Sequence, residues 1–366
     1  MLLTILLLLS LLYMAMFFVC AIAAGFGSPS VRTFRPTVAI IIAARNEEHN
    51  ISRCLTSMTR LSYPLHLLEV VVVDDRSTDA TQDIVDGFAR QYPHIRLVVA
   101  APETGNLRGK TNAVTQGIEA SSGEVLLFTD ADCVVPQGWV EETLKYYVDE
   151  KVGVVAGFTS LGGGGWFSAM QALDWYALFS VAAAANRLGF PVTAVGNNLS
   201  VRRTAYDRVG GYRQIPFSVT EDYALFHSII AKTDFAATFP MDPATTIESA
   251  PCRTWKDLYS QKKRWFTGGR DMELNSLLIF GLAYVYHILL VAGLVFDGRW
   301  VIWEAFLMKI LADFVLILPA VVRFRRWRLL RAFPMYELYF IAYVVVYPLI
   351  VLFGRKVIWK ERTFRD

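Results

Sequence analysis

Charged residues are scarce in this sequence. They make up 19% of the 366 residues, whereas hydrophobic residues make up 54%. This balance is too apolar for an ordinary soluble enzyme, so we expect part of the chain to lie in lipid. The 36 Lys and Arg residues nearly balance the 33 Asp and Glu residues, and the net charge is only +3. So small an excess gives no argument for a nucleic-acid partner.

Cysteine and histidine are also few. The four cysteines are scattered without the spacing of a disulfide framework or a zinc site: Cys20, Cys54, Cys133 and Cys252. This pattern favours a reducing compartment. The five histidines are equally dispersed, so the sequence indicates neither a histidine general base nor a histidine metal site.

Long apolar runs are present on both sides of a more polar middle. Leu2 to Ala24 carries no charge and is long enough for a membrane-spanning helix, which needs roughly 20 residues. A cleaved signal peptide is the alternative, but the run has no basic start and is longer than usual in such peptides. We expect an uncleaved anchor over residues 1–24 and a short linker rich in Gly, Ser and Pro over residues 25–36.

A second membrane region is expected over residues 276–353. It contains three apolar runs: Ser276 to Phe296, Trp300 to Val322 and Met335 to Phe353. The middle run contains Lys309 and Asp313, whose spacing of four allows an ion pair within one helix. Charge neutralisation and a role with substrate are both open for these two residues.

The basic residues near these runs conflict with three simple crossings. Five arginines precede the last run, and the tail over residues 354–366 is also basic. Both clusters favour the cytoplasmic side. Because one crossing would separate them, an interfacial or re-entrant span would remove the conflict.

Between the apolar regions, β-branched runs alternate with helical patterns. The runs are Val38 to Ala43, Val70 to Val73, Ile95 to Ala100 and Val125 to Thr129. Such alternation predicts an α/β fold with a largely parallel sheet that is covered on both faces. Ligands gather at the carboxyl ends of strands in such sheets. Four carboxylates fall there: Asp74, Asp75, Asp130 and Asp132.

Asp130 and Asp132 form an Asp-x-Asp pair. Alternation along an extended chain would direct both carboxylates the same way. Mg²⁺ and Mn²⁺ prefer such oxygen ligands and retain places for water and phosphate oxygens. The pair alone is a weak signal, because a loop cap also fits it. Its place after a buried strand favours a metal site.

Seven strings occur in a characteristic order along the middle of the chain. They are AARNEE (43–48), VVVDDRSTDAT (71–81), GKTNA (109–113), TDAD (129–132), GNNLSVRR (196–203), TED (220–222) and QKKRW (261–265). In this set the sequence resembles the family-2 glycosyltransferases, membrane-associated enzymes with a GT-A catalytic fold. The resemblance implies a Rossmann-like, mixed and mainly parallel sheet over residues 37–270. It also implies inverting transfer of a sugar from a nucleotide-diphosphate donor with Mg²⁺ or Mn²⁺.

The resemblance also implies roles for residues on the donor side. Arg45, Glu47 and Asp75 would hold the base and ribose of the nucleotide. Lys110 would lie near the uridine or the phosphates, although a solvated lysine at a helix start is the alternative. For Asp74, a strand-end cap is the alternative to a nucleotide contact.

Further roles concern the reaction itself. Asp130 and Asp132 would bind the cation, and Asp222 resembles the general base of the family. Such a base takes the proton of the acceptor hydroxyl while the anomeric carbon is attacked from the face opposite the diphosphate. Glu221 would orient the loop, and capping the following helix is compatible with that role.

Gln261, Arg264 and Trp265 match the Gln-x-x-Arg-Trp motif of the family. Their spacing places them on one helical face. Arg264 would pair with diphosphate oxygens, and Trp265 would stack against the acceptor. A basic interfacial helix is the alternative interpretation.

The apolar segment Trp166 to Phe190 contains several polar residues, including Gln171 and Asp174. We expect it to be a buried or interfacial helix that lines the acceptor cleft. A crossing there would put the Asp-x-Asp and Thr-Glu-Asp motifs on opposite sides of the membrane.

The sequence thus predicts an integral membrane enzyme, with its catalytic domain on the cytoplasmic face of the cell inner membrane. It would move a sugar, from a UDP-sugar by resemblance, to a lipid or lipid-linked acceptor. A processive polysaccharide synthase is the alternative, since such relatives share the Gln-x-x-Arg-Trp motif. A non-catalytic membrane scaffold is a distant alternative, because the expected carboxylates are all retained.

Overall fold

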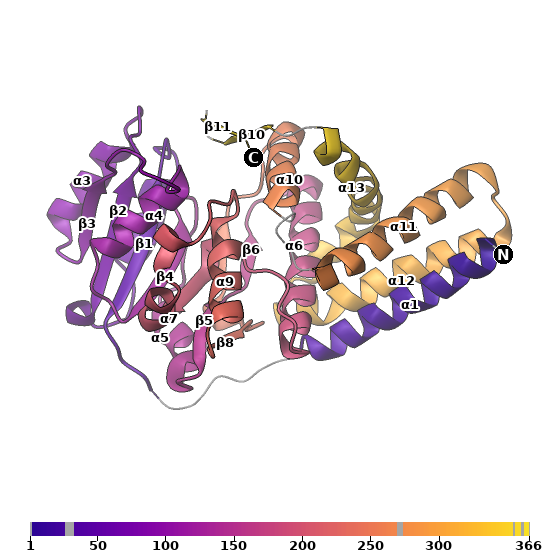
Figure 1. The fold of residues 1–366 in the computed structure, drawn as a ribbon, viewed down its shortest axis with the longest axis horizontal. Helices are drawn as coiled ribbons and strands as arrows, with labels where there is room; N and C mark the ends of the chain where they lie inside the picture. The colour runs from indigo at the N-terminus through magenta and orange to yellow at the C-terminus, as the bar shows by residue number, and fades with distance from the viewer. Residues whose placement is uncertain (1, 26–32, 269–273, 354–355, 360–361, 366) are drawn as a thin grey trace.

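The computed structural model describes residues 2–25, 33–268, 274–353, 356–359 and 362–365. Most of the expected linker lies outside these ranges, as do the last two residues of the expected catalytic region and parts of the basic tail. Figure 1 shows a sheet domain, a middle layer of helices and a long helical hairpin that projects away from the sheet.

The sheet domain is built on seven strands in the order β3-β2-β1-β4-β7-β5-β8. Their bounds are β1 (Val38–Ala44), β2 (Leu68–Asp74), β3 (Ile95–Val99), β4 (Val125–Asp130), β5 (Val152–Ala156), β7 (Leu199–Arg202) and β8 (Ala236–Thr238). Strands β3, β2, β1 and β4 pair in parallel, as do β5 and β8, whereas β7 runs antiparallel to both of its neighbours. The four predicted strands are confirmed, and so is a mixed, mainly parallel sheet.

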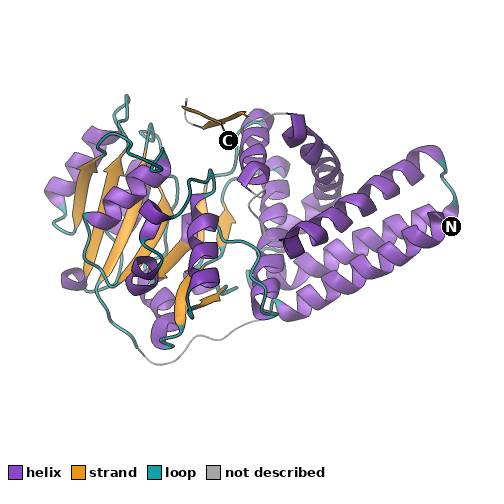
Figure 2. Cartoon of the chain, viewed as in Figure 1, coloured by secondary structure: helices purple, strands orange, loops and turns teal. Residues whose placement is uncertain are grey.

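Helices cover both faces of this sheet, as Figure 2 shows. Along β1, Ile40 and Ile42 pack toward α2 (Ile51–Met58), α3 (Thr81–Gln91) and α5 (Trp139–Leu144). Ile41 packs toward the opposite side, where α4 (Lys110–Glu119), α7 (Arg203–Arg208), α8 (Gly211–Gln214) and α9 (Glu221–Lys232) lie. Because alternate residues of a strand face opposite ways, continuous apolar runs suit a sheet buried on both sides.

A smaller parallel pair, β6 (Thr159–Leu161) and β9 (Ile247–Ser249), lies beside the main sheet. It leads into two helices of the middle layer, α6 (Trp166–Arg187) and α10 (Trp255–Gly268). Most of α6 is buried, and it contacts α1 (Leu2–Ala23), α12 (Trp300–Arg323) and α13 (Phe333–Phe353). The prediction that α6 is a buried helix is therefore confirmed.

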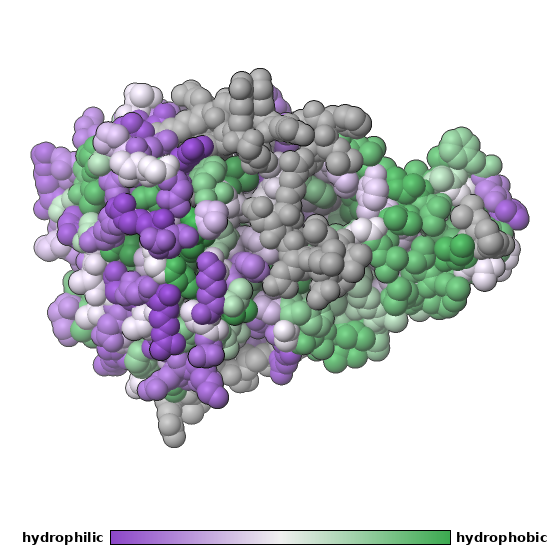
Figure 3. All heavy atoms as spheres, in the orientation of Figure 1, coloured by the Kyte–Doolittle hydropathy of each residue, from purple (hydrophilic) through white to green (hydrophobic). Residues whose placement is uncertain are grey.

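Within the described residues, three helices are long and apolar enough to cross a membrane: residues 3–23, 300–323 and 327–350. Helix α11 (Leu274–Phe296) is also apolar, but its apolar segment Phe280–Phe296 is shorter than these three candidate spans. Helices α1, α11 and α12 form the projecting part of the molecule in Figure 1, and Figure 3 shows its surface to be hydrophobic. By contrast, hydrophilic side chains cover much of the sheet domain in the same view.

A buried ion cluster ties these helices together. Lys309 of α12 pairs with Asp313 at 2.7 Å, as its spacing allows, and also with Glu337 of α13. The hydroxyl of Tyr13 in α1 donates to Asp313 at 2.7 Å. These contacts join α1, α12 and α13, and the ion pair of Lys309 and Asp313 supports the interpretation of charge neutralisation for these two residues.

The segment before helix α13 contacts the sheet domain, and the end of the helix contacts α10. At the end of α12, Phe324 stacks on Phe158, which follows β5, with ring centroids 4.2 Å apart. Near the end of α13, the ring centroid of Tyr347 lies 5.7 Å from that of Tyr259 in α10. The strand β10 (Lys356–Trp359), which pairs with β11 (Arg362–Arg365), also contacts α10. The arginine-rich loop thus adjoins the sheet domain, and the tail adjoins α10.

Candidate active site

The loops that follow β1 and β2 are joined by a set of hydrogen bonds. The amide of Asn46 donates to Ser77 Oγ at 3.0 Å, and Asn46 Oδ1 accepts from the Thr78 amide at 2.9 Å. The amide of Glu47 donates to Thr81 Oγ1 at 2.7 Å. Asn46 has φ 51°, a left-handed conformation that asparagine adopts more readily than most residues. The two motifs thus form one rigid edge of the sheet.

The predicted nucleotide-binding residues lie in this edge. Arg45 donates from Nη1 to the carbonyl oxygen of Asp75 at 2.7 Å, and the Asp75 side chain is almost completely buried. Glu47 Oε2 accepts from the side-chain amide of Asn50 at 2.7 Å. Asp74 Oδ2 accepts from the Ser77 amide at 3.1 Å, which supports the cap interpretation for this residue.

A cavity of about 480 Å³ opens beside these loops. It joins three of the sequence motifs, because Glu47, Asp132 and Gln261 all line it. The remaining wall comes largely from the segment before α10, with Pro251, Cys252 and Arg253, and from Asp257 in its first turn.

The Asp-x-Asp pair differs from its predicted geometry. Strand β4 ends at Asp130, and Ala131 and Asp132 form a turn. The expected alternation along an extended chain is therefore wrong for Asp132. Asp130 lies 2.7 Å from Lys110 Nζ, whereas Asp132 Oδ2 accepts from Ser249 Oγ of β9 at 3.5 Å.

Lys110 connects two of the acidic motifs. Its ammonium group lies 2.7 Å from Asp130 Oδ1 and 2.9 Å from Glu221 Oε1. The side chain is 19% exposed, so the alternative of a solvated lysine is wrong. Burial alone lowers the pKa of Lys110, but Asp130 and Glu221 outweigh it and raise that pKa above the usual lysine value.

Asp222 lies beside this group, in the first turn of α9. Its Oδ2 accepts from the Gly196 amide at 2.6 Å, and its Oδ1 accepts from the Tyr223 amide at 2.8 Å. Burial and the neighbouring Glu221 raise the pKa of Asp222 to about 6, although Lys110 and the two amides act in the opposite direction. A carboxylate with such a pKa is suited to accept a proton near neutral pH.

The glycine at position 196 makes this arrangement possible. A Cβ atom there would lie 2.8 Å from Cβ of Asp222, closer than packed carbons approach. Asn198, two residues after Gly196, is buried. It accepts from Trp139 Nε1 at 3.0 Å and donates to the carbonyl of Phe158 at 2.8 Å. The asparagine therefore has a structural role that spacing alone did not show.

The Gln-x-x-Arg-Trp motif lies on α10. Gln261 lines the cavity, Arg264 is half-buried, and the Trp265 ring lies 5.7 Å from that of Trp175 in α6. The residue that sequence reasoning missed is Lys262, which is 2% exposed and paired with Asp174 of α6. Buried charges are rarely visible in a sequence, because a charge run usually indicates a solvated surface.

A divalent cation fits the chemistry of Asp130 and Asp132, whose oxygens are hard ligands. Within the described ranges, no three His, Cys, Asp or Glu side chains are grouped to hold a metal ion by themselves. The two aspartates would therefore need phosphate oxygens or water to complete the coordination.

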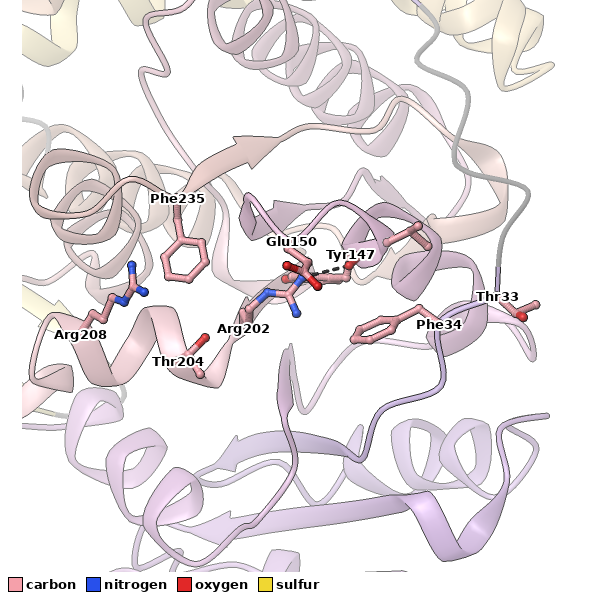
Figure 4. A pocket seen from close by; sticks show the side chains of 9 residues that line it. Thr33, Phe34, Tyr147, Glu150, Arg202, Thr204, Arg208 and Phe235 are labelled. Atoms are coloured by element: carbon pink, nitrogen blue, oxygen red, sulfur yellow. Dashed lines mark hydrogen bonds between the residues drawn. The ribbon is translucent and has the colours of Figure 1, made fainter.

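A second cavity, of about 440 Å³, lies on the other side of the sheet domain. Figure 4 shows the side chain of Arg202 beside Tyr147, with Phe34 on the same side of the cavity. Arg202 stacks on both rings and donates to the carbonyls of Val152 and Tyr147. These contacts hold its guanidinium against two rings and two backbone carbonyls, which indicates a structural role. Arg202 pairs with the first residue of β4, at the end of that strand remote from Asp130.

Comparisons with known proteins agree with this architecture. Residues 39–210 match the pattern of Glycosyl transferase family 2, and residues 125–354 match that of Glycosyl transferase family group 2. The chain is 30% identical over 259 residues to the probable glycosyltransferase YdaM of Bacillus subtilis, which covers 67% of this chain and 58% of that protein. It is also 30% identical over 249 residues to the beta-monoglucosyldiacylglycerol synthase of Nostoc sp., which covers 66% of this chain and 50% of that protein. The chain spans about half the length of the curated relatives it matches.

A solved structure shares the fold over nearly the whole chain. It is the mannosyltransferase PcManGT from Pyrobaculum calidifontis in complex with GDP-Man and Mn²⁺, with a TM-score of 0.63 and 21% sequence identity. The match covers 96% of this chain and 99% of that protein. The predicted GT-A fold, with apolar helices toward both ends, is therefore confirmed.

Proposed function

The chain belongs to glycosyl transferase family 2, and we propose that it is an inverting transferase acting on a membrane lipid or lipid-linked acceptor. The donor would be a nucleotide-diphosphate sugar, and we propose a UDP-sugar. One observation carries this proposal: Asp222, with a pKa of about 6, lies next to the chain of contacts from Glu221 through Lys110 to Asp130. This cluster of charged side chains beside a carboxylate of raised pKa supports the assignment of a base and a phosphate site there.

Asp222 is the proposed general base. Above pH 6 its carboxylate accepts the proton of the acceptor hydroxyl, and that oxygen forms the new bond to the anomeric carbon. The bond from the anomeric carbon to the diphosphate breaks on the opposite face, and its electron pair leaves with the nucleotide. Such a displacement inverts the configuration of the sugar.

The donor would occupy the cavity beside the first two motifs. Arg45, Glu47 and Asp75 would hold the base and ribose, and Gln261 and Arg264 would face the diphosphate from α10. Asp130 and Asp132 would hold Mg²⁺ or Mn²⁺, which stabilises the negative charge of the departing diphosphate when bound. The Lys110 ammonium pairs with both Asp130 and Glu221 and compensates part of their combined negative charge.

The acceptor is proposed from the apolar part of the molecule. Helices α1 and α12 suit a membrane, and α6, which contacts both, joins them to the sheet domain. A relative named beta-monoglucosyldiacylglycerol synthase supports a glycerolipid or similar acceptor. We propose that the catalytic domain lies on the cytoplasmic face of the cell inner membrane.

A panel of sugar nucleotides tests this function. The full chain in lipid nanodiscs is incubated with UDP-sugars and GDP-mannose, Mn²⁺ or Mg²⁺ and a native lipid extract, and the released nucleotide is measured. We expect one UDP-sugar to give rapid, lipid-dependent release and a lipid carrying a single sugar of inverted configuration. A polymer ladder would favour a processive synthase instead, and an inactive protein would contradict the proposed activity.

A further inference from the structure

Helix α6 carries two buried polar side chains one turn apart. Gln171 is 2% exposed and Asp174 is 6% exposed, although most of their neighbours on this helix are apolar. Burying polar groups is unfavourable unless they find partners. Both of these find their partners in α10 or in the segment that precedes it.

Gln171 holds the segment before α10 by a two-way pairing. Its Nε2 donates to the Cys252 carbonyl at 3.1 Å, and its Oε1 accepts from the Cys252 amide at 2.9 Å. A side-chain amide can replace a neighbouring strand in this way, because it both donates and accepts. Cys252 and its neighbours form a wall of the cavity that Asp132 and Gln261 also line.

Asp174 holds the middle of α10. It pairs with Lys262, whose ammonium also lies 4.2 Å from the ring centroid of Trp265 and 5.0 Å from that of Tyr343. The buried side chain of Lys262 points into the protein and thereby sets the rotation of α10 about its own axis. Gln261 is the preceding residue, so its direction is set as well. That rotation leaves Gln261 at the cavity.

The end of α10 adjoins the Thr-Glu-Asp motif. A Cβ atom on Gly268 would lie 2.2 Å from Oγ1 of Thr220, so only glycine permits this approach. The helix is therefore held before its start by Gln171, in its middle by Asp174 and at its end by Thr220.

We propose that Gln171 and Asp174 are positioning residues, which set the place and rotation of α10 so that Gln261 and Arg264 meet the donor diphosphate. This inference rests on the proposed function. It assigns no contact with substrate to either residue. Without Asp174, Lys262 loses its partner and α10 rotates about its axis. Without Gln171, the segment at Cys252 that forms the cavity wall moves.

Steady-state kinetics on the full chain in nanodiscs test the proposal, with the sugar nucleotide that turns over fastest in the panel. We expect Asp174→Asn to lower kcat about tenfold or more with donor KM changed less than threefold, since small misplacements of reacting groups are costly. Gln171→Met is expected to raise donor KM by a comparable factor. Glu119→Gln removes an exposed ion pair with Arg213 and is the control that keeps wild-type kinetics.

Rescue separates positioning from general stability. The double variant Asp174→Lys/Lys262→Asp restores the opposite charges, so we expect it to recover several-fold more kcat than either single variant. Wild-type kinetics in Asp174→Asn would overturn the proposal. Equal losses of kcat in the single and double variants, in proportion to their lower melting temperatures, would also overturn the proposal.

Hydrogen exchange provides a readout that needs no activity. In Asp174→Asn we expect faster exchange in residues 250–268, with the β1 and β2 amides unchanged. If the wild type released no nucleotide, the proposed function would fail, yet this measurement would still decide whether Asp174 holds α10. Unchanged protection of α10 would overturn the inference.

Discussion

The Lys110 ammonium group lies 2.7 Å from a carboxylate oxygen of Asp130. The first residue of α4 is thereby joined to the last residue of β4, and the same ammonium reaches Glu221 at the start of α9. Three motifs that are far apart in the sequence meet at this cation. Without it, two carboxylates would face each other and a third, Asp222, in a partly buried site.

Replacing Lys110 tests this role. In Lys110→Met, Asp130 and Glu221 lose their shared partner, and the remaining negative charge opposes the donor diphosphate. We expect kcat/KM to fall at least a hundredfold, a loss of about 2.7 kcal/mol of transition-state stabilisation. Lys145→Met removes a surface pair with Glu142 and is the matched control. Activity near that of the wild type would show that Lys110 has no part in transfer.

The pH dependence of the reaction tests the general base. Because Asp222 acts as a base only when ionised, kcat/KM should rise with pH and level off above a pKa of about 6. Glu221 raises this pKa and Lys110 lowers it. The acidic limb should therefore move to lower pH in Glu221→Gln and to higher pH in Lys110→Met. Asp222→Asn should lose the limb together with at least about 100-fold of the rate.

Donor binding provides the control for this pH series. Asp222→Asn is expected to bind the nucleotide as the wild type does, as measured by calorimetry with UDP and Mn²⁺. If the limb stays at the same pH in both charge variants, another group must be the base.

The fold was predictable because its signals are local. Continuous Val and Ile runs at Val38 to Ala43 and Val70 to Val73 can be satisfied only where both faces of a strand are buried. The alternating helical segments then require a parallel sheet with helices on either side. Strands β5, β7 and β8 of the main sheet were missed, because they are short and none of them is a continuous β-branched run like Val70 to Val73.

The site was predictable in its residues but less so in its geometry. The order of the acidic strings indicated one site, and the fold brings Lys110, Asp130 and Glu221 together. The predicted direction of the Asp132 side chain was wrong, because hydrogen bonds to distant parts of the fold decide where a strand ends. The pair of Lys262 and Asp174 was missed because the two residues are 88 positions apart, and nothing local connects them.

Metal dependence is tested at Asp132. Its carboxylate lines the cavity in which we propose that the donor binds, so we expect Asp132→Asn to raise the Mn²⁺ concentration for half-maximal activity at least tenfold. A chelator should abolish transfer in the wild type, and added Mn²⁺ should restore it. The control is Asp257→Asn, which changes another carboxylate at this cavity and should leave metal affinity unchanged. Transfer that persists in excess chelator would contradict the proposed metal site.

A variant in the buried ion cluster tests how α1, α12 and α13 are held together. Lys309→Met leaves Asp313 and Glu337 buried without their cation, a type of change that costs about 3–5 kcal/mol. We expect a clear fall in the melting temperature of the detergent-solubilised protein. The variant Lys309→Met/Glu337→Met removes one of the orphaned charges and should recover part of the loss. Equal melting of wild type and Lys309→Met would argue against a stabilising cluster.

The position of α13 predicts the sidedness of the tail. Phe324 before this helix contacts the sheet domain, and Tyr347 near its end contacts α10. We therefore expect both ends on one side of the membrane, with α13 re-entrant or interfacial, which also places the arginine-rich loop and the tail together as the positive-inside rule requires. Reporters fused after Asp366 and inserted at Gly298, in the turn between α11 and α12, measure this directly. The tail reporter should share the side of the catalytic domain and the Gly298 reporter should lie opposite, whereas a tail opposite the domain would mean that α13 crosses once.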